Sequence, residues 1–233
     1  MIAWRLHRQE TTVSTNLDAR TGEPGDVFAA DFQTAGRGRL GHVWCSPAKA
    51  NLLMSAVLST ADRPPEEVAT LPLVVGLAVV RAVTRFLDAG ARRERPLLKW
   101  PNDVLVGGRK LAGILCERHG DRIVAGIGVN VHEQEFPPEI AARAAFLGAG
   151  TVDEVRERVL DELGMLYETW RMRGFASVHP EIAAVDALKG RYVTVRQTDD
   201  DREPVAGVSA GIRPDGSLDV AGRAVYAGEV VRR

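Results

Sequence analysis

The residues that decide the fold read Leu111-Ala-Gly-Ile-Leu-Cys-Glu117 and, past His119-Gly120-Asp121, Ile123-Val-Ala-Gly-Ile-Gly-Val-Asn-Val131. Both stretches are apolar and rich in residues that favour strands. The residues between them are typical of a tight turn. The sequence therefore predicts two neighbouring antiparallel strands at the centre of a sheet.

Shorter apolar segments on the N-terminal side extend this sheet. Gly107-Gly108 predicts a second tight turn, which joins the central pair to the strand before it. The additional strands are expected at residues 26–33, 51–58, 97–100 and 104–106. Together these segments predict a central mixed or antiparallel sheet.

Helical patterns lie between and after the strands. Residues 66–89 form a long apolar stretch that Gly90 is expected to end. Two more helices are expected at residues 152–173 and 176–187, and side-chain oxygens of Ser14-Thr-Asn16 can cap a short helix. Helices packed on a sheet give an α+β fold class.

The C-terminal residues change character and read as a small antiparallel barrel. Short strands separated by turn residues are expected at 191–196, 205–208, 217–220 and 228–231. We place a domain boundary near Leu188, with a larger domain over residues 1–187 and a small domain over residues 188–233.

The composition excludes several classes of protein. Over 233 residues the net charge is −1, so no global positive field supports non-specific binding to nucleic acid. Cys45 and Cys116 lack the spacing of a metal or redox motif, which favours a reducing compartment. The N-terminus lacks a signal-peptide core, and the apolar run at 71–80 is short for a membrane span. We therefore expect a cytoplasmic protein without a membrane partner.

A basic glycine loop, Gly36-Arg-Gly-Arg-Leu-Gly-His-Val-Trp44, is the main functional signal. Glycine lets the backbone approach a ligand, and Arg37 and Arg39 offer forked donors for phosphate or carboxylate oxygens. The loop matches G-x-G-x-x-G, but it leads into a strand instead of opening a helix, which argues against a dinucleotide site. A solvated basic turn is the other interpretation of the loop alone.

Three further polar features help to decide between a ligand-binding loop and a solvated basic turn. Lys99-Trp-Pro-Asn-Asp103 places a carboxylate suited to Mg²⁺ after a rigid corner, although Asn102 and Asp103 are also typical of a turn. Lys110 begins a strand, where an exposed hairpin lysine is common. Asn130 lies in an apolar strand and needs a buried partner, unless it lies at a sheet edge.

Taken together, these motifs resemble those of biotin protein ligases. The loop is similar to their GRGRxGRxW loop, residues 99–103 match their KWPND signature, and residues 110–117 resemble KLAGILVE. Ser14-Thr-Asn16, Gln33-Thr-Ala-Gly36 and Gly126-Ile-Gly-Val-Asn130 also match in order and spacing. The resemblance implies a class II synthetase-like catalytic domain followed by an SH3-like domain. Because Ser14 lies so near the start, we expect a short form without the N-terminal DNA-binding domain and without DNA as a partner.

The resemblance also implies an activity and its partners. Such ligases form biotinyl-5′-AMP from biotin and MgATP, with Mg²⁺ as cofactor, and then transfer biotin to a lysine of a biotin carboxyl carrier domain. The acceptor would belong to a biotin-dependent carboxylase. Family members are monomers or dimers, so a homodimer is among the expected states, and no interface can be identified.

Site residues follow from the matched motifs. Lys110 would bridge the biotin carboxylate and the α-phosphate, Arg39 would contact the adenylate, and Asp103 would hold Mg²⁺ or accept a proton from the incoming lysine. Ser14, Thr15, Asn16, Gln33, Gly36, Arg37, Gly38, Arg39, Lys110 and Gly113 are the expected biotin-binding residues. Arg39, Trp44, Asn102, Asp103, Lys110 and Asn130 are the expected nucleotide-binding residues.

The loop also carries a hypothesis about motion and one departure from the family. Its glycines and like charges favour disorder without a ligand, so we hypothesise that biotin or the adenylate orders it. His42 stands where the family usually has an arginine, which removes a permanent charge. Weaker loop closure and pH-dependent closure are both consistent with this change.

Two rival functions remain to be separated from the biotin ligase. Lipoate ligases and octanoyltransferases share the catalytic fold but lack the paired loop and KWPND motifs. A different class is a non-catalytic module. The presence of Lys110, Asp103 and Asn130 opposes a biotin-binding module, and the expected lack of the N-terminal domain opposes a DNA-regulatory one.

Overall fold

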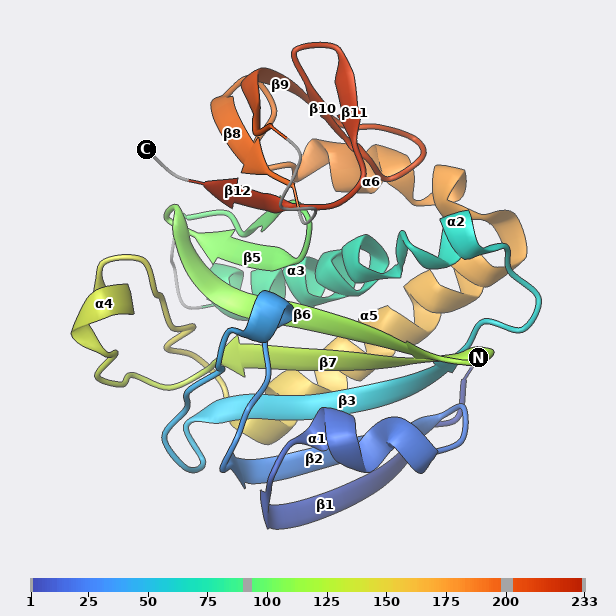
Figure 1. Ribbon diagram of the computed structural model, residues 1–233. Helices are drawn as coiled ribbons and strands as arrows, with labels where there is room; N and C mark the ends of the chain where they lie inside the picture. The colour runs from blue at the N-terminus through green and yellow to red at the C-terminus, as the bar shows by residue number, and fades with distance from the viewer. Residues whose placement is uncertain (1, 90–93, 198–202, 232–233) are drawn as a thin grey trace.

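The computed structural model describes residues 2–89, 94–197 and 203–231, and their strands form two sheets (Figure 1). The larger sheet has seven strands in the order β1-β2-β3-β7-β6-β5-β4. Their bounds are β1 Arg5–Thr12, β2 Asp26–Gln33, β3 Asn51–Ser59, β4 Leu97–Lys99, β5 Asp103–Val106, β6 Arg109–His119 and β7 Arg122–Asn130. Only β1 and β2 pair in parallel among these strands, so the sheet is mixed, as predicted.

The central hairpin forms as the sequence predicts. β6 and β7 pair without interruption from Ala112 opposite Val129 to His119 opposite Arg122. Gly120 turns the hairpin with a φ of 63°, and Gly107 and Gly108 turn the preceding one with φ of 57° and 74°. These left-handed values favour glycine.

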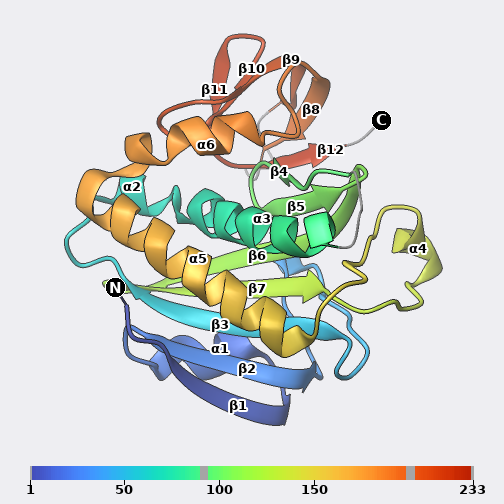
Figure 2. The same cartoon turned by 180° about the vertical axis from the view of Figure 1, so that it is seen from behind.

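Two long helices cover one face of the large sheet (Figure 2). They are α3, Leu71–Ala89, and α5, Val152–Arg173, which begins with a capping box between Thr151 and Glu154. The apolar side chains of β3, β6 and β7 that point to this face, such as Met54, Ile114 and Ile127, are almost completely buried. This layer is the main hydrophobic core.

The prediction of one continuous helix over residues 66–89 is wrong. The segment consists of two helices, α2, Pro65–Val68, and α3, with a break at Thr70. The Thr70 hydroxyl donates to the Glu67 carbonyl and accepts from Trp170 Nε1, so this side chain fixes the change of direction. Gly90, expected to end the helix, lies outside the described residues.

The apolar run at residues 71–80 was too short to predict a membrane span, but the helical segment Pro65–Ala89 is longer. By length and composition it could cross a membrane, but 72% of its apolar window is buried inside the protein. A buried core helix passes the same test, and the packing of α3 against the sheet gives that explanation here.

The opposite face of the large sheet carries a short helix and a long loop. α1, Thr15–Asp18, begins after Ser14, but the Ser14 side chain makes no capping hydrogen bond, contrary to expectation. The Ser14 carbonyl instead accepts from the backbone of Leu17 and Asp18. α1 and residues 34–50 lie in front of the strands in Figure 1.

The smaller sheet contains β8 Tyr192–Arg196, β9 Val205–Ile212, β10 Leu218–Val220, β11 Arg223–Val225 and β12 Glu229–Val231. All its pairs are antiparallel, as predicted for the C-terminal residues. β11 was not predicted, because its three residues carry no alternating pattern. The domain boundary near Leu188 stays a prediction.

The connection between the sheets differs from the predicted helix at 176–187. A turn of 3-10 helix, Phe175–Ser177, precedes α6, His179–Ala184, and residues 185–187 then run beside β4. Leu98 exchanges backbone hydrogen bonds with Val185 and Ala187, which ends the helix early. Trp100 is buried and donates from Nε1 to the Gly216 carbonyl at 3.1 Å, so the KWPND segment is anchored to the smaller sheet.

β1 is the strand of the larger sheet that was not predicted. It reads RLHRQETT, seven of its eight residues are exposed, and it forms an edge of the sheet, so no alternation of apolar and polar residues marks it. Asp26 of β2 holds it in place, with its Oδ1 2.8 Å from Arg5 Nε and 3.0 Å from His7 Nε2. Burial opposes ionisation of Asp26, but hydrogen bonds from His7, the Glu23 N–H and Arg5 outweigh it and lower its pKa to about 2.

The Asp26 carboxylate makes the free energy of unfolding depend on pH in the acid range. Because the folded pKa lies below the unfolded one, its contribution is present above about pH 4 and is lost as the pH falls towards 2. We expect Asp26→Asn to remove about 1–2 kcal/mol of unfolding free energy at neutral pH and to flatten its fall in acid. Urea unfolding between pH 2 and 7 measures this. Glu10→Gln, exposed on β1, is the control, and an equal acid dependence in both variants would contradict the assignment.

Candidate active site

A cavity of about 550 Å³ lies on the face of the large sheet opposite α3 and α5. Its walls come from the sheet, from the loop at 36–44, from the segment at 136–144 and from β8 and β12 of the smaller sheet. The predicted site residues that line it are Ser14, Thr15, Asn16, Gln33, Arg37, Gly38, Arg39, Trp44, Asn102, Asp103, Lys110, Gly113 and Asn130. Gly36 does not line it; a side chain there would collide with the Trp44 carbonyl.

Part of the cavity floor consists of glycine backbone on β6 and β7. Gly113 of β6 and Gly128 of β7 are directly paired, and Gly126 lies two residues further along the same face. The indole of Trp44 lies over this pair: a Cβ on Gly128 would be 2.7 Å from the ring, and one on Gly113 would be 3.1 Å from it. Sequence reading listed Gly113 but gave no role to Gly128, because only the strand register brings the two together.

The basic loop is a small hairpin. Arg37 pairs with Val43, Gly38 N–H donates to the His42 carbonyl at 2.7 Å, and Trp44 N–H donates to the Gly36 carbonyl at 2.9 Å. Leu40 and Gly41 turn it with φ of 53° and 77°. These bonds give the loop more internal order than its composition indicates. The hypothesis that a ligand orders it further stays a prediction.

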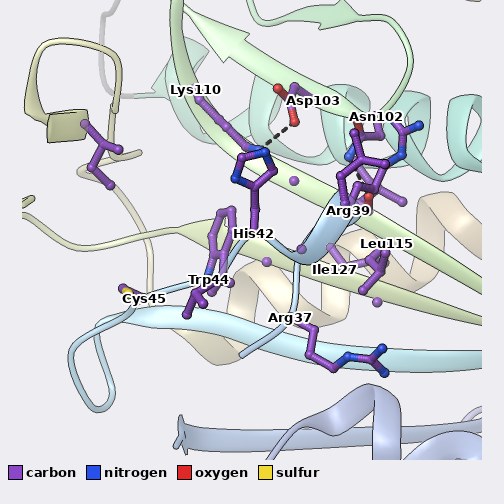
Figure 3. Close-up of a pocket in the computed structure, with 18 of the residues that line it drawn as sticks. Arg37, Arg39, His42, Trp44, Cys45, Asn102, Asp103, Lys110, Leu115 and Ile127 are labelled. Carbon is purple, nitrogen blue, oxygen red and sulfur yellow. Dashed lines mark hydrogen bonds and ion pairs between the residues drawn. The ribbon is translucent and has the colours of Figure 1, made fainter. Parts of the chain in front are cut away.

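The two loop arginines point to opposite ends of the cavity (Figure 3). Arg37 Nη1 lies 3.0 Å from Glu117 Oε1. Arg39 Nη1 donates to Asn102 Oδ1 at 3.3 Å and to the Gly228 carbonyl at 3.4 Å. Burial lowers the pKa of Arg39, opposed by the nearby charges of Asp103 and Glu229. Arg39 is therefore a partly desolvated cation between the two sheets, where an anion would be bound strongly.

Lys110 and Asp103 form an ion pair beside Arg39. Lys110 Nζ lies 2.6 Å from Asp103 Oδ1, and Lys99 Nζ lies 4.0 Å from Asp103 Oδ2 (Figure 3). Lys110 Nζ also lies 5.6 Å from the centre of the Trp44 ring. The Lys110 backbone is fixed by bonds to Arg143 and Ala145, so this lysine is not a free hairpin residue.

The two predicted asparagines are held by the protein itself. Asn102 donates from Nδ2 to the Ile114 carbonyl at 2.8 Å, which leaves its Oδ1 facing Arg39. Asn130 is buried and donates from Nδ2 to the Ala145 carbonyl at 2.9 Å. This bond supplies the buried partner that the sequence required, and it holds the segment that also fixes Lys110.

One end of the cavity is lined by uncharged polar groups. Thr15 N–H donates to Gln33 Oε1 at 2.7 Å, and Thr15 Oγ1 lies 3.1 Å from the same oxygen. Asn16 donates from Nδ2 to Glu117 Oε2 at 2.7 Å. Ser55, completely buried behind them, has its Oγ 2.8 Å from Thr15 Oγ1 and 2.7 Å from Asn16 Oδ1. Sequence reading missed Ser55 and Glu117, since both lie in apolar strands.

The smaller sheet completes the wall. Arg196, Glu229, Val230 and Val231 line the cavity, although no site residue was predicted there. His42 Nε2 lies 3.8 Å from Glu229 Oε1, so the residue that departs from the family motif faces β12. The smaller sheet therefore contributes chemical groups to the cavity as well as covering it.

Comparisons with known proteins agree with this site. The sequence profile of the biotin/lipoate A/B protein ligase family matches residues 4–133. The biotin--[acetyl-CoA-carboxylase] ligase of Mycobacterium tuberculosis is 36% identical over 247 aligned residues, covering 98% of this chain and 89% of that protein. That of Paracoccus denitrificans is 31% identical and covers 94% of each. The biotin protein ligase of Aquifex aeolicus, solved in complex with biotin and ATP, has a TM-score of 0.80 and 27% identity, over 97% of this chain and 94% of that chain.

The fold and the relatives together define a ligase. The chain belongs to the biotin/lipoate A/B protein ligase family. The predicted family, ligase class and α+β fold are therefore confirmed. The bifunctional ligase/repressor BirA of Bacillus subtilis is similar over a shorter stretch, with 34% identity over 62% of this chain and 45% of that protein.

The glycine floor can be tested directly. In Gly128→Ala the new methyl group overlaps the Trp44 ring, so the indole must leave the floor, at a cost of about 1–3 kcal/mol. We expect a change in tryptophan emission and a lower melting temperature. The same substitution in a Trp44→Phe background should leave the emission of the remaining tryptophans unchanged. A shift of equal size in both backgrounds would contradict the contact.

Proposed function

We propose that this protein is an ATP-dependent biotin protein ligase, which forms biotinyl-5′-AMP and transfers biotin to a lysine of a biotin carboxyl carrier domain. The observation that carries the proposal is the placement of Lys110, Arg39 and Asp103 together, between a polar end of the cavity and the smaller sheet. The biotin ligases to which the chain is similar over nearly its full length support it.

The first step has to bring two anions together. A carboxylate is a poor electrophile and must first be activated. Its oxygen attacks the α-phosphorus of ATP, the bond to the β-phosphate breaks and pyrophosphate leaves, so negative charge develops on the phosphoryl oxygens and on the leaving group. Lys110 would contact the biotin carboxylate and the α-phosphate at once, and Arg39 would stabilise the charge that develops at phosphorus. Arg37 is paired with Glu117 and would act from the polar end.

The cavity's shape gives each substrate a place. The ureido ring of biotin would lie at the polar end against Ser14, Thr15, Asn16 and Gln33, and Gly113 would lie further along, next to Lys110. The adenylate would extend past Arg39 towards Asn102, Asn130 and Trp44. Gly36 and Gly38 would act through the hairpin backbone, which brings Arg37 and Arg39 into the cavity.

Magnesium would enter with ATP. Mg²⁺ is commonly held by one or two carboxylates together with substrate phosphates. Asp103 lines the cavity beside the two catalytic cations and fits that role; within residues 2–89, 94–197 and 203–231 no group of three candidate ligands forms a metal site of its own. The ion would neutralise phosphate charge during adenylate formation.

In the second step the acceptor lysine attacks the acyl carbon of the adenylate, an amide bond forms and AMP leaves. The ammonium group of the acceptor lysine must first lose a proton, and Asp103 is the carboxylate next to Lys110 that would accept it. The acceptor would be the carrier domain of a carboxylase. We further propose a cytoplasmic location, no DNA or membrane partner, a catalytic domain over residues 1–187, an SH3-like domain over 188–233, and a monomer or homodimer.

Lys110→Ala tests the centre of the proposal. Without the bridging cation, biotin-dependent ATP–pyrophosphate exchange should fall by at least about a hundredfold, while the melting temperature stays near that of the parent. Lys189→Ala, an exposed lysine outside the cavity, is the matched control and should retain exchange. Near-normal exchange in Lys110→Ala would remove this lysine from the chemistry. No exchange with biotin but exchange with lipoate in the parent would overturn the function itself.

Arg39→Ala tests retention of the intermediate. Arg39 links the loop to Asn102 and to the smaller sheet, so its loss should both weaken the contact with the adenylate and loosen the wall of the cavity. We expect faster release of the adenylate, detected as biotin labelling of a bystander protein such as serum albumin. Arg63→Ala, a cation outside the cavity, is the control; equal labelling by the Arg39 and Arg63 variants would refute the role.

A further inference from the structure

The polar end of the cavity contains a chain of hydrogen bonds whose direction is fixed by groups outside the cavity. Thr15, Asn16 and Gln33 line the cavity, whereas Ser55 and Glu117 lie behind them and do not. The links run from Glu117 to Asn16, from Asn16 to Ser55 and from Ser55 to Thr15, each between 2.7 and 2.8 Å. At these distances each link requires a hydrogen between its two atoms.

The first link fixes the Asn16 amide. Its nitrogen faces two oxygens, the Glu117 carboxylate at 2.7 Å and the Leu115 carbonyl at 3.3 Å. Both are acceptors, so only the NH₂ end of the amide can face them. Asn16 Oδ1 must then point away, towards Ser55. Gly126 makes room for this amide, since a side chain there would collide with Asn16.

The second link uses the only proton of Ser55. Asn16 Oδ1 cannot donate, so the Ser55 hydroxyl must donate to it. Ser55 Oγ can then only accept from Thr15 Oγ1, which lies 2.8 Å away. Thr15 therefore directs its proton inward, and its lone pairs are what it offers to the cavity. The longer 3.1 Å contact between Thr15 Oγ1 and Gln33 Oε1 is the one left without a hydrogen.

The side-chain amide of Gln33 is also held in one orientation, but it offers a donor where Thr15 offers an acceptor. Its Oε1 accepts the Thr15 backbone N–H at 2.7 Å, and a backbone N–H can only donate. The oxygen end of the amide therefore faces Thr15, and its Nε2 lies on the other side, next to Gly36. At the polar end, Thr15 Oγ1 therefore offers an acceptor and Gln33 Nε2 offers a donor.

We infer that Ser55 and Glu117 are positioning residues for substrate selection, which hold Thr15 as an acceptor and thereby select a ligand with an adjacent N–H donor and C=O acceptor. A cyclic urea has this pattern, whereas a dithiolane ring has neither group. The inference rests on the proposed function and adds the residues that would distinguish biotin from lipoate within the same fold. A site built to accept a hydrogen bond rejects a ligand that lacks the donor, because the buried acceptor is then left unpaired.

The test separates this role from a purely structural one through the Michaelis constants. In Ser55→Ala, Thr15 can turn its proton towards Gln33 or the ligand, so the KM for biotin in pyrophosphate exchange should rise about five- to tenfold. The KM for ATP and kcat should stay unchanged, because the chain of bonds touches only the polar end. Ser209→Ala removes an equally buried hydroxyl from β9, outside the cavity, and should leave all three constants unchanged.

A second comparison asks whether Ser55 acts through Thr15. Thr15→Val alone should also raise the KM for biotin, and adding Ser55→Ala to it should have no further effect if the two form one chain. Additive effects would overturn the inference, as would an unchanged KM for biotin in Ser55→Ala. If Ser55→Ala does not fold, Ser55→Cys, whose thiol is a weak donor, should show a smaller rise in the same constant, and no rise would again overturn it.

Glu117→Gln tests whether Glu117 sets the direction of the hydrogen-bond chain. With a neutral amide at this position, only the Leu115 carbonyl at 3.3 Å still requires the NH₂ end of Asn16, so the direction of the chain is held less firmly. We expect the KM for biotin to rise and the binding of lipoate to change less. An unchanged ratio of biotin to lipoate binding would contradict the role of Glu117. A parent protein that binds lipoate and not biotin would instead refute the proposed function, so the two failures are distinguishable.

Discussion

The register between β6 and β7 is the constraint on which the rest of the structure depends. It places Gly113 opposite Gly128 on one face and Ile114 opposite Ile127 on the other. The isoleucine face packs against α3 and α5 as the core, and the glycine face forms the floor of the cavity. Because side chains alternate along a strand, a slip of one residue would exchange the two faces and destroy both. One set of backbone hydrogen bonds thus specifies the core and the site together.

The parts of the fold that sequence predicts well are those with a strong local pattern. The β6–β7 hairpin combines apolar strands with turn glycines, and α5 combines a helical pattern with a capping box at Thr151. β1 was missed because its pattern is polar, and its pairing depends on Asp26, more than a dozen residues away in sequence. The break at Thr70 depends on Trp170, from another helix, which no local pattern can show.

The residues of the candidate site also divide into those that a local sequence motif reveals and those that only tertiary contacts reveal. Charged residues in short motifs, such as Lys110 and Asp103, could be found because their types suit the chemistry and the motifs are specific. Ser55 and Glu117 could not, because a single polar residue in a strand gives no signal until tertiary structure shows what it contacts. Residues of the smaller sheet were missed for a similar reason. Glu229 gains a role only because β12 lies against the cavity.

The glycine floor has a consequence for the thermodynamics of ligand binding. A floor made of side chains has to restrict their rotation when a ligand arrives, and that loss of conformational entropy weakens binding. Backbone at Gly113, Gly126 and Gly128 is already fixed by the strand pairing, so it has no rotamers to lose. The shape of this surface is set when the protein folds, so Trp44 and Asn16, which lie against these glycines and line the cavity, rest on a support that is rigid in advance.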